Sequence, residues 1–214
     1  SVSFLDDYWQ RKPLLIRNDS EGFRPPLSSD ELATLALDDD IESRLIEQRD
    51  SAWQQQHGPF CAADFKREHP WTLLVQAVDH YNPAVAELQR LFDFIPRWRM
   101  DDVMVSYAVD GGSAGPHYDN YDVFLLQGEG HRLWRIGQYC DSTSALLPHD
   151  EMRILKDFNS SEQYLLGPGD VLYVPPGIAH WGIAQGECTT FSIGFRAPTI
   201  SDMLTRWTAQ LLLQ

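Results

Sequence analysis

The stretch DVMVSYAVDGGSAGPHYDNYDVFLLQGEGHRLWRI, residues 102–136, decides the fold class of this chain. It holds short runs rich in β-branched and aromatic residues, and Gly-rich turns separate these runs. The same alternation continues in QYLL, VLYV and TTFSIGF, with the turns GPGD and PPG following the first two. Several short strands at regular spacing, separated by turn signals, predict a sandwich or a barrel.

The N-terminal half mixes strands with short helices. Lys12–Arg17 (KPLLIR) reads as a strand, and Trp71–Val78 reads as a strand, with a helix as the alternative. Ser28 and Glu31 have the spacing of a capping box, which predicts that a helix begins at ELATLAL. Pro83 suits the first turn of a helix through AVAELQRLF. We therefore expect helices that flank a mainly β protein.

Composition limits the partners and the compartment. The chain has 214 residues, enough for one domain, and its 31 acidic and 17 basic residues give a net charge of −14. Such a surface repels nucleic acid and acidic membranes and attracts basic proteins, although acidity that serves only solubility is an equal alternative.

The three cysteines form no CxxC pair, which favours a reducing, cytoplasmic setting. No apolar run is long enough to span a membrane. Because the chain starts at Ser1, we expect it to be a fragment or a trimmed chain.

Two histidines and an aspartate are the candidate metal ligands. His117 and Asp119 are two residues apart on a predicted strand, so both side chains should project from one face. His180 follows the Pro-Pro-Gly bend in VPPGIAHWG. Two histidines and one carboxylate form the facial set of non-haem Fe(II) oxygenases. Taken separately, the HxD pair and His180 are more often buried, hydrogen-bonded structural residues; the combination favours a metal site.

Arg132 is the second informative position. In HRLWRI, period two places Arg132 on one face with Trp134 and Ile136. An arginine on an apolar face either extends its charge to solvent or is buried with an anion. Guanidinium matches a carboxylate with two parallel hydrogen bonds, so a dicarboxylate bound near the metal is a candidate partner.

These residues resemble the JmjC branch of the cupin-type Fe(II)/2-oxoglutarate oxygenases, and in particular the bacterial ribosomal oxygenases of the YcfD (RoxA) type. The resemblance is carried by VSYAVDGGSAGPHYDNYDVFLLQGEGHRLWRIG, LGPGDVLYVPPGIAHWG and SIGFRAPT, and by the opening FLDDYWQRKPLLIRN. It implies a double-stranded β-helix, the jelly-roll barrel of the cupins. It also implies an Fe(II)- and 2-oxoglutarate-dependent protein hydroxylase that uses dioxygen. In this group the bacterial members hydroxylate an arginine of large-subunit ribosomal protein sixteen.

The resemblance assigns a role to each matching position. His117, Asp119 and His180 fall on the iron ligands, Arg132 falls on the residue that holds the distal carboxylate of 2-oxoglutarate, and Ser106 falls on the wall of the same pocket. No further catalytic residue is implied beyond the metal ligands. Thr190 departs from the pattern, because the family suggests an amide side chain there. Its effect on the co-substrate pocket is left open.

The resemblance also divides the chain. Residues 1–198 would form the catalytic domain with its N-terminal α+β segment, and residues 199–214 would begin a helical region that forms a homodimer. The winged-helix domain of the family would be absent from this chain. The last stretch has helical spacing of apolar residues on one face, at Met203, Leu204, Trp207, Leu211 and Leu212.

Alternatives to an arginine hydroxylase stay open at this point. They are a JmjC enzyme acting on histidine, asparagine or methyl-lysine, a cupin dioxygenase that needs no 2-oxoglutarate, and a non-catalytic cupin that binds a ligand or partner. For a guanidinium substrate, Tyr121, Asp122 and Asp101 are candidate contacts, although ordinary structural roles are favoured for all three. The target protein and residue do not follow from the sequence.

Overall fold

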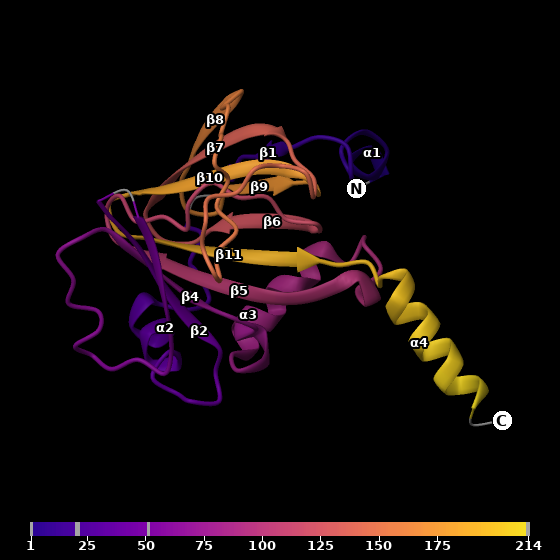
Figure 1. Cartoon of the computed structure of the whole chain (residues 1–214), viewed down its shortest axis with the longest axis horizontal. Helices are drawn as coiled ribbons and strands as arrows, with labels where there is room; N and C mark the ends of the chain where they lie inside the picture. Colours follow the sequence, from indigo (N-terminus) through magenta and orange to yellow (C-terminus); the bar gives the residue numbers. More distant parts are fainter. Residues whose placement is uncertain (1, 20–21, 51, 213–214) are drawn as a thin grey trace.

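The structure, a computed structural model, describes residues 2–19, 22–50 and 52–212. Its strands form two antiparallel sheets (Figure 1). The large sheet has the order β1-β9-β6-β11-β5-β4-β2-β3, with bounds Leu14–Ile16, Val171–Val174, Asp122–Gln127, Cys188–Phe195, Met100–Ala108, Trp71–Val75, Ser43–Arg49 and Ala52–His57. The small sheet has the order β10-β7-β8, with bounds Ile178–Gln185, His131–Tyr139 and Glu162–Leu166.

The helices are short and lie mostly in the N-terminal half. The α-helices are α1, Val2–Asp7, α2, Ser29–Leu35, α3, Pro83–Ala86, and α4, Ile200–Leu211; the 3-10 helices are η1, Val78–His80, η2, Glu87–Phe92, and η3, Arg97–Arg99. The predicted capping box is confirmed at the start of α2, where the Ser28 side chain accepts from the Glu31 N–H and the Glu31 carboxylate accepts from the Ser28 N–H.

The helix predicted after Pro83 is only partly right. Asn82 caps α3 by accepting from the N–H groups of Ala84 and Val85, and Pro83 occupies the first helical turn as expected. From Glu87 the backbone tightens into the 3-10 helix η2, so the predicted single helix is two consecutive elements. The segment predicted as a strand or a helix from Trp71 is the strand β4.

The large sheet buries both of its faces. Its outer face packs against the helices in a core that includes Leu32, Val85, Phe92, Phe124 and Phe195. Its inner face packs against the small sheet in a second core that includes Val123, Leu125, Trp134, Ile136 and Leu172. Because side chains alternate along a strand, Phe124 faces outward while Val123 and Leu125 face inward.

The predicted fold class is confirmed, except that the strands do not form a closed barrel. The protein is mainly β with flanking helices, and two facing sheets correspond to the two sheets of a jelly roll. Within the residues that the structure describes, the strand ladders leave β1 and β3 as the end strands of the large sheet and β10 and β8 as those of the small one. The molecule is therefore an open sandwich, and strand pairing does not close it.

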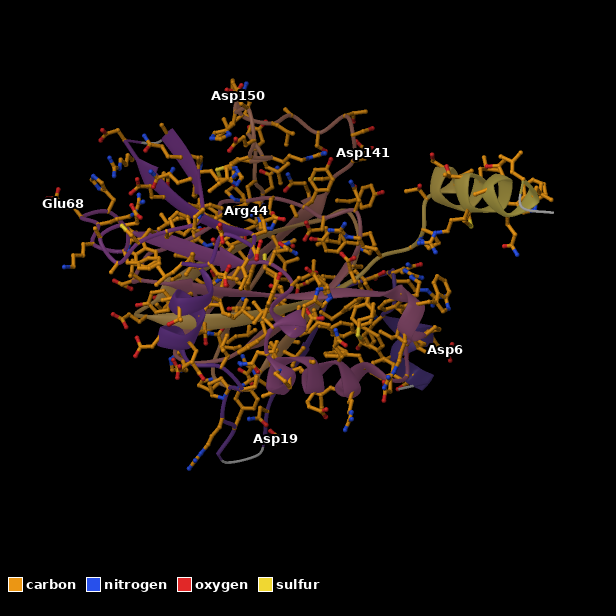
Figure 2. All side chains as sticks on the ribbon, turned by 90° about the horizontal axis from the view of Figure 1, so that it is seen from below. Asp6, Asp19, Arg44, Glu68, Asp141 and Asp150 are labelled. Carbon is orange, nitrogen blue, oxygen red and sulfur yellow. The ribbon has the colours of Figure 1, made fainter. Side chains whose placement is uncertain are left out.

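Helix α4 projects away from the two sheets (Figure 1), and the view in Figure 2 shows the same separation. The helix predicted here is confirmed as far as Leu211; residues 213–214 of the expected dimerisation region lie outside the described residues. The apolar positions on its predicted face are exposed, with Trp207 at 62%. No described helix has the length and apolar character needed to cross a membrane.

Candidate metal centre and interior pocket

Three side chains with metal-ligating atoms meet at one end of the space between the sheets. His117, Asp119 and His180 each place one such atom within 4.8 Å of the others. His180 Nε2 lies 3.6 Å from Asp119 Oδ2, and the two imidazole rings are 4.4 Å apart. Two imidazoles and one carboxylate form a donor set that suits Fe(II).

The backbone brings these residues together in a way that differs from the predicted one. The HxD pair is not on a strand, because β6 begins only at Asp122. Instead, His117 and His180 pair directly as an isolated bridge: the His117 N–H donates to the His180 carbonyl at 3.1 Å, and the reverse bond measures 2.8 Å. His180 lies within β10. The two histidines therefore come together because the backbones of two segments that are distant in the sequence are hydrogen-bonded at this point.

The Pro-Pro-Gly bend before β10 positions Asp119. The Gly177 N–H donates to the Asp119 carbonyl at 2.8 Å, which ties the bend to the HxD segment. Gly177 has a φ of +79°, and a Cβ there would lie 2.5 Å from the Tyr139 ring. Both the left-handed backbone and the close ring require glycine at this position.

Hydrogen bonds set the tautomers of the two histidines. Nδ1 of His117 lies 2.9 Å from the Gly115 carbonyl, and Nδ1 of His180 lies 3.0 Å from the Ile178 carbonyl. A carbonyl accepts only, so each Nδ1 carries the proton and each Nε2 keeps a lone pair. Burial, and next the neighbouring His117, lower the pKa of His180 to about 4. This imidazole is therefore neutral near pH 7, as a metal ligand must be.

Arg132 lies farther along the same interior. The predicted alternation is confirmed, because Arg132, Trp134 and Ile136 are all at most 5% exposed. Arg132 Nη1 donates to Ser106 Oγ at 3.3 Å, and Nε donates to Cys188 Sγ at 3.4 Å. Its Nη2 is buried and has no hydrogen-bond partner among the residues that the structure describes. A buried cation with an unsatisfied donor and no carboxylate partner within the described residues fits an anionic ligand.

Thr190, where the family resemblance suggested an amide side chain, forms a polar pair with Gln127. Thr190 Oγ1 donates to the side-chain oxygen of Gln127 at 3.2 Å, and both side chains are buried. Thr190 and Ser106 face each other on β11 and β5, and the Ser106 hydroxyl lies 3.5 Å from the Thr190 carbonyl. An amide side chain is therefore present beside this position, although it comes from β6.

A groove of about 470 Å³ runs along the inner face of the large sheet, and its lining includes none of His117, Asp119, His180 and Arg132. Its lining includes Tyr121, two residues after Asp119, and continues along the inner face to Met104 and Ser192. At its rim, Asp101 pairs with Arg196 at 2.6 Å, and Asp102 Oδ2 accepts from the Gln76 side chain and the Ala77 N–H.

Carboxylates outnumber cations in this groove. Three lining carboxylates, from Glu42, Asp101 and Asp102, face two arginines, Arg44 and Arg196. Burial raises the pKa of Asp101, and Arg196 partly offsets this rise. Burial also raises the pKa of Tyr121, and the charge of Asp119 adds to the effect. The groove is therefore weakly acidic and has a mostly polar lining.

One of the suggested substrate contacts has a structural role. Asp122 is fully buried and accepts from the Tyr173 hydroxyl at 2.6 Å and from Gln10 Nε2 at 3.1 Å, with Arg99 at 3.5 Å. It faces the helix-covered side of the large sheet, whereas Asp101 and Tyr121 line the groove. This outcome agrees with the structural role that the sequence favoured for Asp122.

Several pocket residues were not predicted from the sequence. They are Cys188, Gln127, Met104, Asp102 and Ser192. A signal for some of them was present in TTFSIGF. There Thr190, Ser192 and Gly194 alternate with the apolar Phe191, Ile193 and Phe195, as expected for a strand with one polar inner face.

Comparison with known proteins agrees with this geometry. The family model of the JmjC domain matches residues 87–203. The chain is 42% identical over 202 residues to the ribosomal protein uL16 3-hydroxylase of Escherichia coli, covering 94% of this chain and 54% of that protein. It is 41% identical over 204 residues to a probable ribosomal oxygenase of Haemophilus influenzae, covering 94% of this chain and 50% of that protein.

Solved structures show the same fold. The Escherichia coli ribosomal oxygenase YcfD in complex with cobalt and 2-oxoglutarate matches with a TM-score of 0.88 at 39% identity, covering 99% of this chain and 55% of that one. The chain thus spans about half the length of the curated relatives it matches. The family model covers more than half of the chain, and the chain belongs to the JmjC domain family.

Proposed function

We propose that this chain is the catalytic part of an Fe(II)- and 2-oxoglutarate-dependent protein hydroxylase that acts on an arginine of a large-subunit ribosomal protein. One observation carries the proposal. His117, Asp119 and His180 meet at one end of an interior whose other end holds the buried Arg132, with an unsatisfied donor. A metal and an anion can therefore be bound within one interior, the anion end buried and the metal end partly open to solvent.

The chain's own residues would bind and orient the reactants. His117 Nε2, His180 Nε2 and the Asp119 carboxylate would hold Fe(II) and leave other coordination positions open. Arg132 would bind the distal carboxylate of 2-oxoglutarate, and Ser106 would support this contact. When bound, the iron and 2-oxoglutarate supply the oxidising chemistry, in which dioxygen gives one oxygen atom to succinate and one to a C–H bond. No protein base is required.

The groove supports a cationic substrate side chain. Tyr121 and Met104 would contact the methylene stem of an arginine, and its guanidinium would compete with Arg196 for the Asp101 carboxylate. The chain's net charge of −14 would attract a basic protein. The Escherichia coli relative is named for hydroxylating ribosomal protein uL16, and we propose the equivalent protein as the substrate here. Such a substrate places the enzyme in the cytoplasm.

We also propose how the chain is organised. Residues 1–198 would be the catalytic domain, and residues 199–214 would begin a helical dimerisation region. The support for a homodimer is the exposed apolar face of α4, which includes Met203, Leu204 and Trp207. A contiguous exposed apolar face of this kind is typical of an interaction surface.

The test is mass spectrometry of ribosomal proteins incubated with the purified protein, Fe(II), 2-oxoglutarate and air. The proposal predicts a mass gain of one oxygen atom on an arginine, dependent on 2-oxoglutarate. The same gain on histidine or asparagine, or loss of a methyl group from lysine, would identify a different JmjC reaction. Oxidation without 2-oxoglutarate would identify a cupin dioxygenase. No modification of any ribosomal protein would contradict the proposed function.

A further inference from the structure

Two buried N–H donors on the same face of β7 have no hydrogen-bond partner in the part of the chain that the structure describes. They are Nη2 of Arg132 and Nε1 of Trp134, and the two residues are 5% exposed each. Because they are two positions apart on one strand, both side chains point into the space between the sheets. A buried donor without an acceptor is costly, so the pair together indicates something that accepts from both.

Trp134 lies between the anion-binding residue and the metal ligands. The guanidinium carbon of Arg132 is 5.9 Å from the Trp134 ring, and the His180 ring is 5.8 Å from it on centroids. A dicarboxylate that is held by Arg132 and reaches a metal at His180 would therefore pass the indole. The proposed function accounts for Arg132 and His180 but gives Trp134 no role.

The indole is held in place by a glycine on the neighbouring strand. Trp134 pairs with Gly182 in the β7–β10 ladder. A Cβ at Gly182 would lie 2.7–2.9 Å from three carbons of the six-membered ring of Trp134. The outer edge of this ring therefore rests on the Gly182 backbone, and the absence of a side chain there allows the indole to enter the interior.

A second tryptophan next to the metal ligands provides a contrast. The Trp181 indole N–H donates to Ser113 Oγ at 2.9 Å and so is satisfied within the protein. Of the other buried atoms without partners among the described residues, Ser43, Glu47 and Thr72 belong to β2 and β4, and Arg135 lies on the opposite face of β7. Among the described residues, only Arg132 and Trp134 place such an unpaired atom in the interior pocket.

We propose that Trp134 is a positioning residue for the dicarboxylate co-substrate, and that its indole N–H donates a hydrogen bond to an oxygen of the anion held between Arg132 and the metal ligands. This inference rests on the proposed function and deepens it. The indole would add a contact part-way along the anion, whose two ends the proposed function places at Arg132 with Ser106 and at the metal ligands.

The direct test observes the indole proton itself. Protein labelled with nitrogen-15 at tryptophan and loaded with Zn(II), which is diamagnetic, is titrated with 2-oxoglutarate. The Trp134 indole signal is assigned by its absence in Trp134→Phe. We expect this signal to move downfield and its exchange with solvent to slow, while the Trp181 signal stays in place. An unmoved Trp134 signal in protein that binds 2-oxoglutarate would mean that the donor is satisfied by water, and it would overturn the inference.

Affinity measurements separate this inference from the proposed function. Trp134→Phe keeps an aromatic ring and removes the N–H, so the dissociation constant for 2-oxoglutarate should rise by about tenfold or more. Zn(II) affinity should be unchanged, and Trp181→Phe should bind 2-oxoglutarate as the wild type does. Unchanged 2-oxoglutarate affinity in Trp134→Phe, or an equal loss of Zn(II) affinity, refutes the role of Trp134. Failure of the wild-type protein to bind 2-oxoglutarate refutes the proposed function itself.

Discussion

Replacing Arg132 with methionine should stabilise the ligand-free protein but weaken its binding of 2-oxoglutarate. In the ligand-free protein Arg132 is 5% exposed, and its hydrogen-bond partners among the described residues are the Ser106 hydroxyl and the Cys188 thiol. A buried cation without a carboxylate is unfavourable, and methionine keeps the apolar stem. We expect Arg132→Met to raise the free energy of unfolding of the ligand-free protein by about 1–3 kcal/mol.

The loss of ligand affinity follows from the same contacts. A hydrogen bond to a charged group contributes about 1.5–3 kcal/mol. The Nη2 donor of Arg132 is unsatisfied and shielded from water, which favours the upper end of this range. The dissociation constant for 2-oxoglutarate should therefore rise by roughly a hundredfold, equivalent to about 3 kcal/mol. Lysine should restore only part of this affinity, because an ammonium cannot form the two parallel bonds.

Chemical unfolding with and without 2-oxoglutarate measures both effects. At a ligand concentration of about 100 times the wild-type dissociation constant, the wild type should gain about 2.7 kcal/mol and Arg132→Met about 0.4 kcal/mol. Arg135→Met is the matched control, because Arg135 lies on the other face of β7 and stacks on Trp181. Its ligand response should equal that of the wild type. If Arg132→Met keeps the full ligand stabilisation, Arg132 is a packing residue and the anion binds elsewhere.

Three further predictions concern the metal ligands, the buried carboxylate and the terminal helix. His117→Ala and Asp119→Ala should lose stoichiometric metal binding and turnover while the metal-free proteins keep wild-type circular dichroism; retained metal binding would contradict the assignment. Asp122→Ala should lower the free energy of unfolding by about 2–4 kcal/mol, because the Tyr173 hydroxyl loses a buried acceptor; a urea titration that gives less than about 1 kcal/mol would show that water replaces the carboxylate. Trp207→Glu should convert a dimer into a monomer by light scattering, and a monomeric wild type would refute dimerisation through α4.

The sequence could predict which face of a strand or which end of a helix some residues occupy, because this depends on short-range patterns; the roles of the candidate site residues came from the family resemblance. The alternation in HRLWRI was enough to place Arg132 on an apolar face, and the strand confirms it. The Ser28 and Glu31 spacing was enough to predict the start of α2. These patterns involve residues within a few positions of each other, where local geometry determines which side chains share a face.

The parts that were wrong depend on contacts between distant segments. The HxD segment was expected on a strand, but it meets β10 through the His117–His180 bridge, and no local pattern encodes that pairing. The edge strand β3, Ala52–His57, was not predicted because its sequence AWQQQH has weak β propensity; pairing with β2 forms it. The groove gathers Glu42, Gln76, Asp101 and Gly194 from separate strands and loops, so only the fold could bring them together.

We propose that His117, Asp119, His180 and Arg132 support oxidation of a protein side chain coupled to oxidation of 2-oxoglutarate. The most direct measurement is to follow both oxygen atoms of heavy-isotope dioxygen in a reaction with Fe(II), 2-oxoglutarate and the ribosomal protein substrate. We expect one labelled oxygen in succinate and one in the hydroxylated arginine, in equal amounts, and neither product with Asp119→Ala. A hydroxyl oxygen that comes from water, or hydroxylation without succinate, would contradict it.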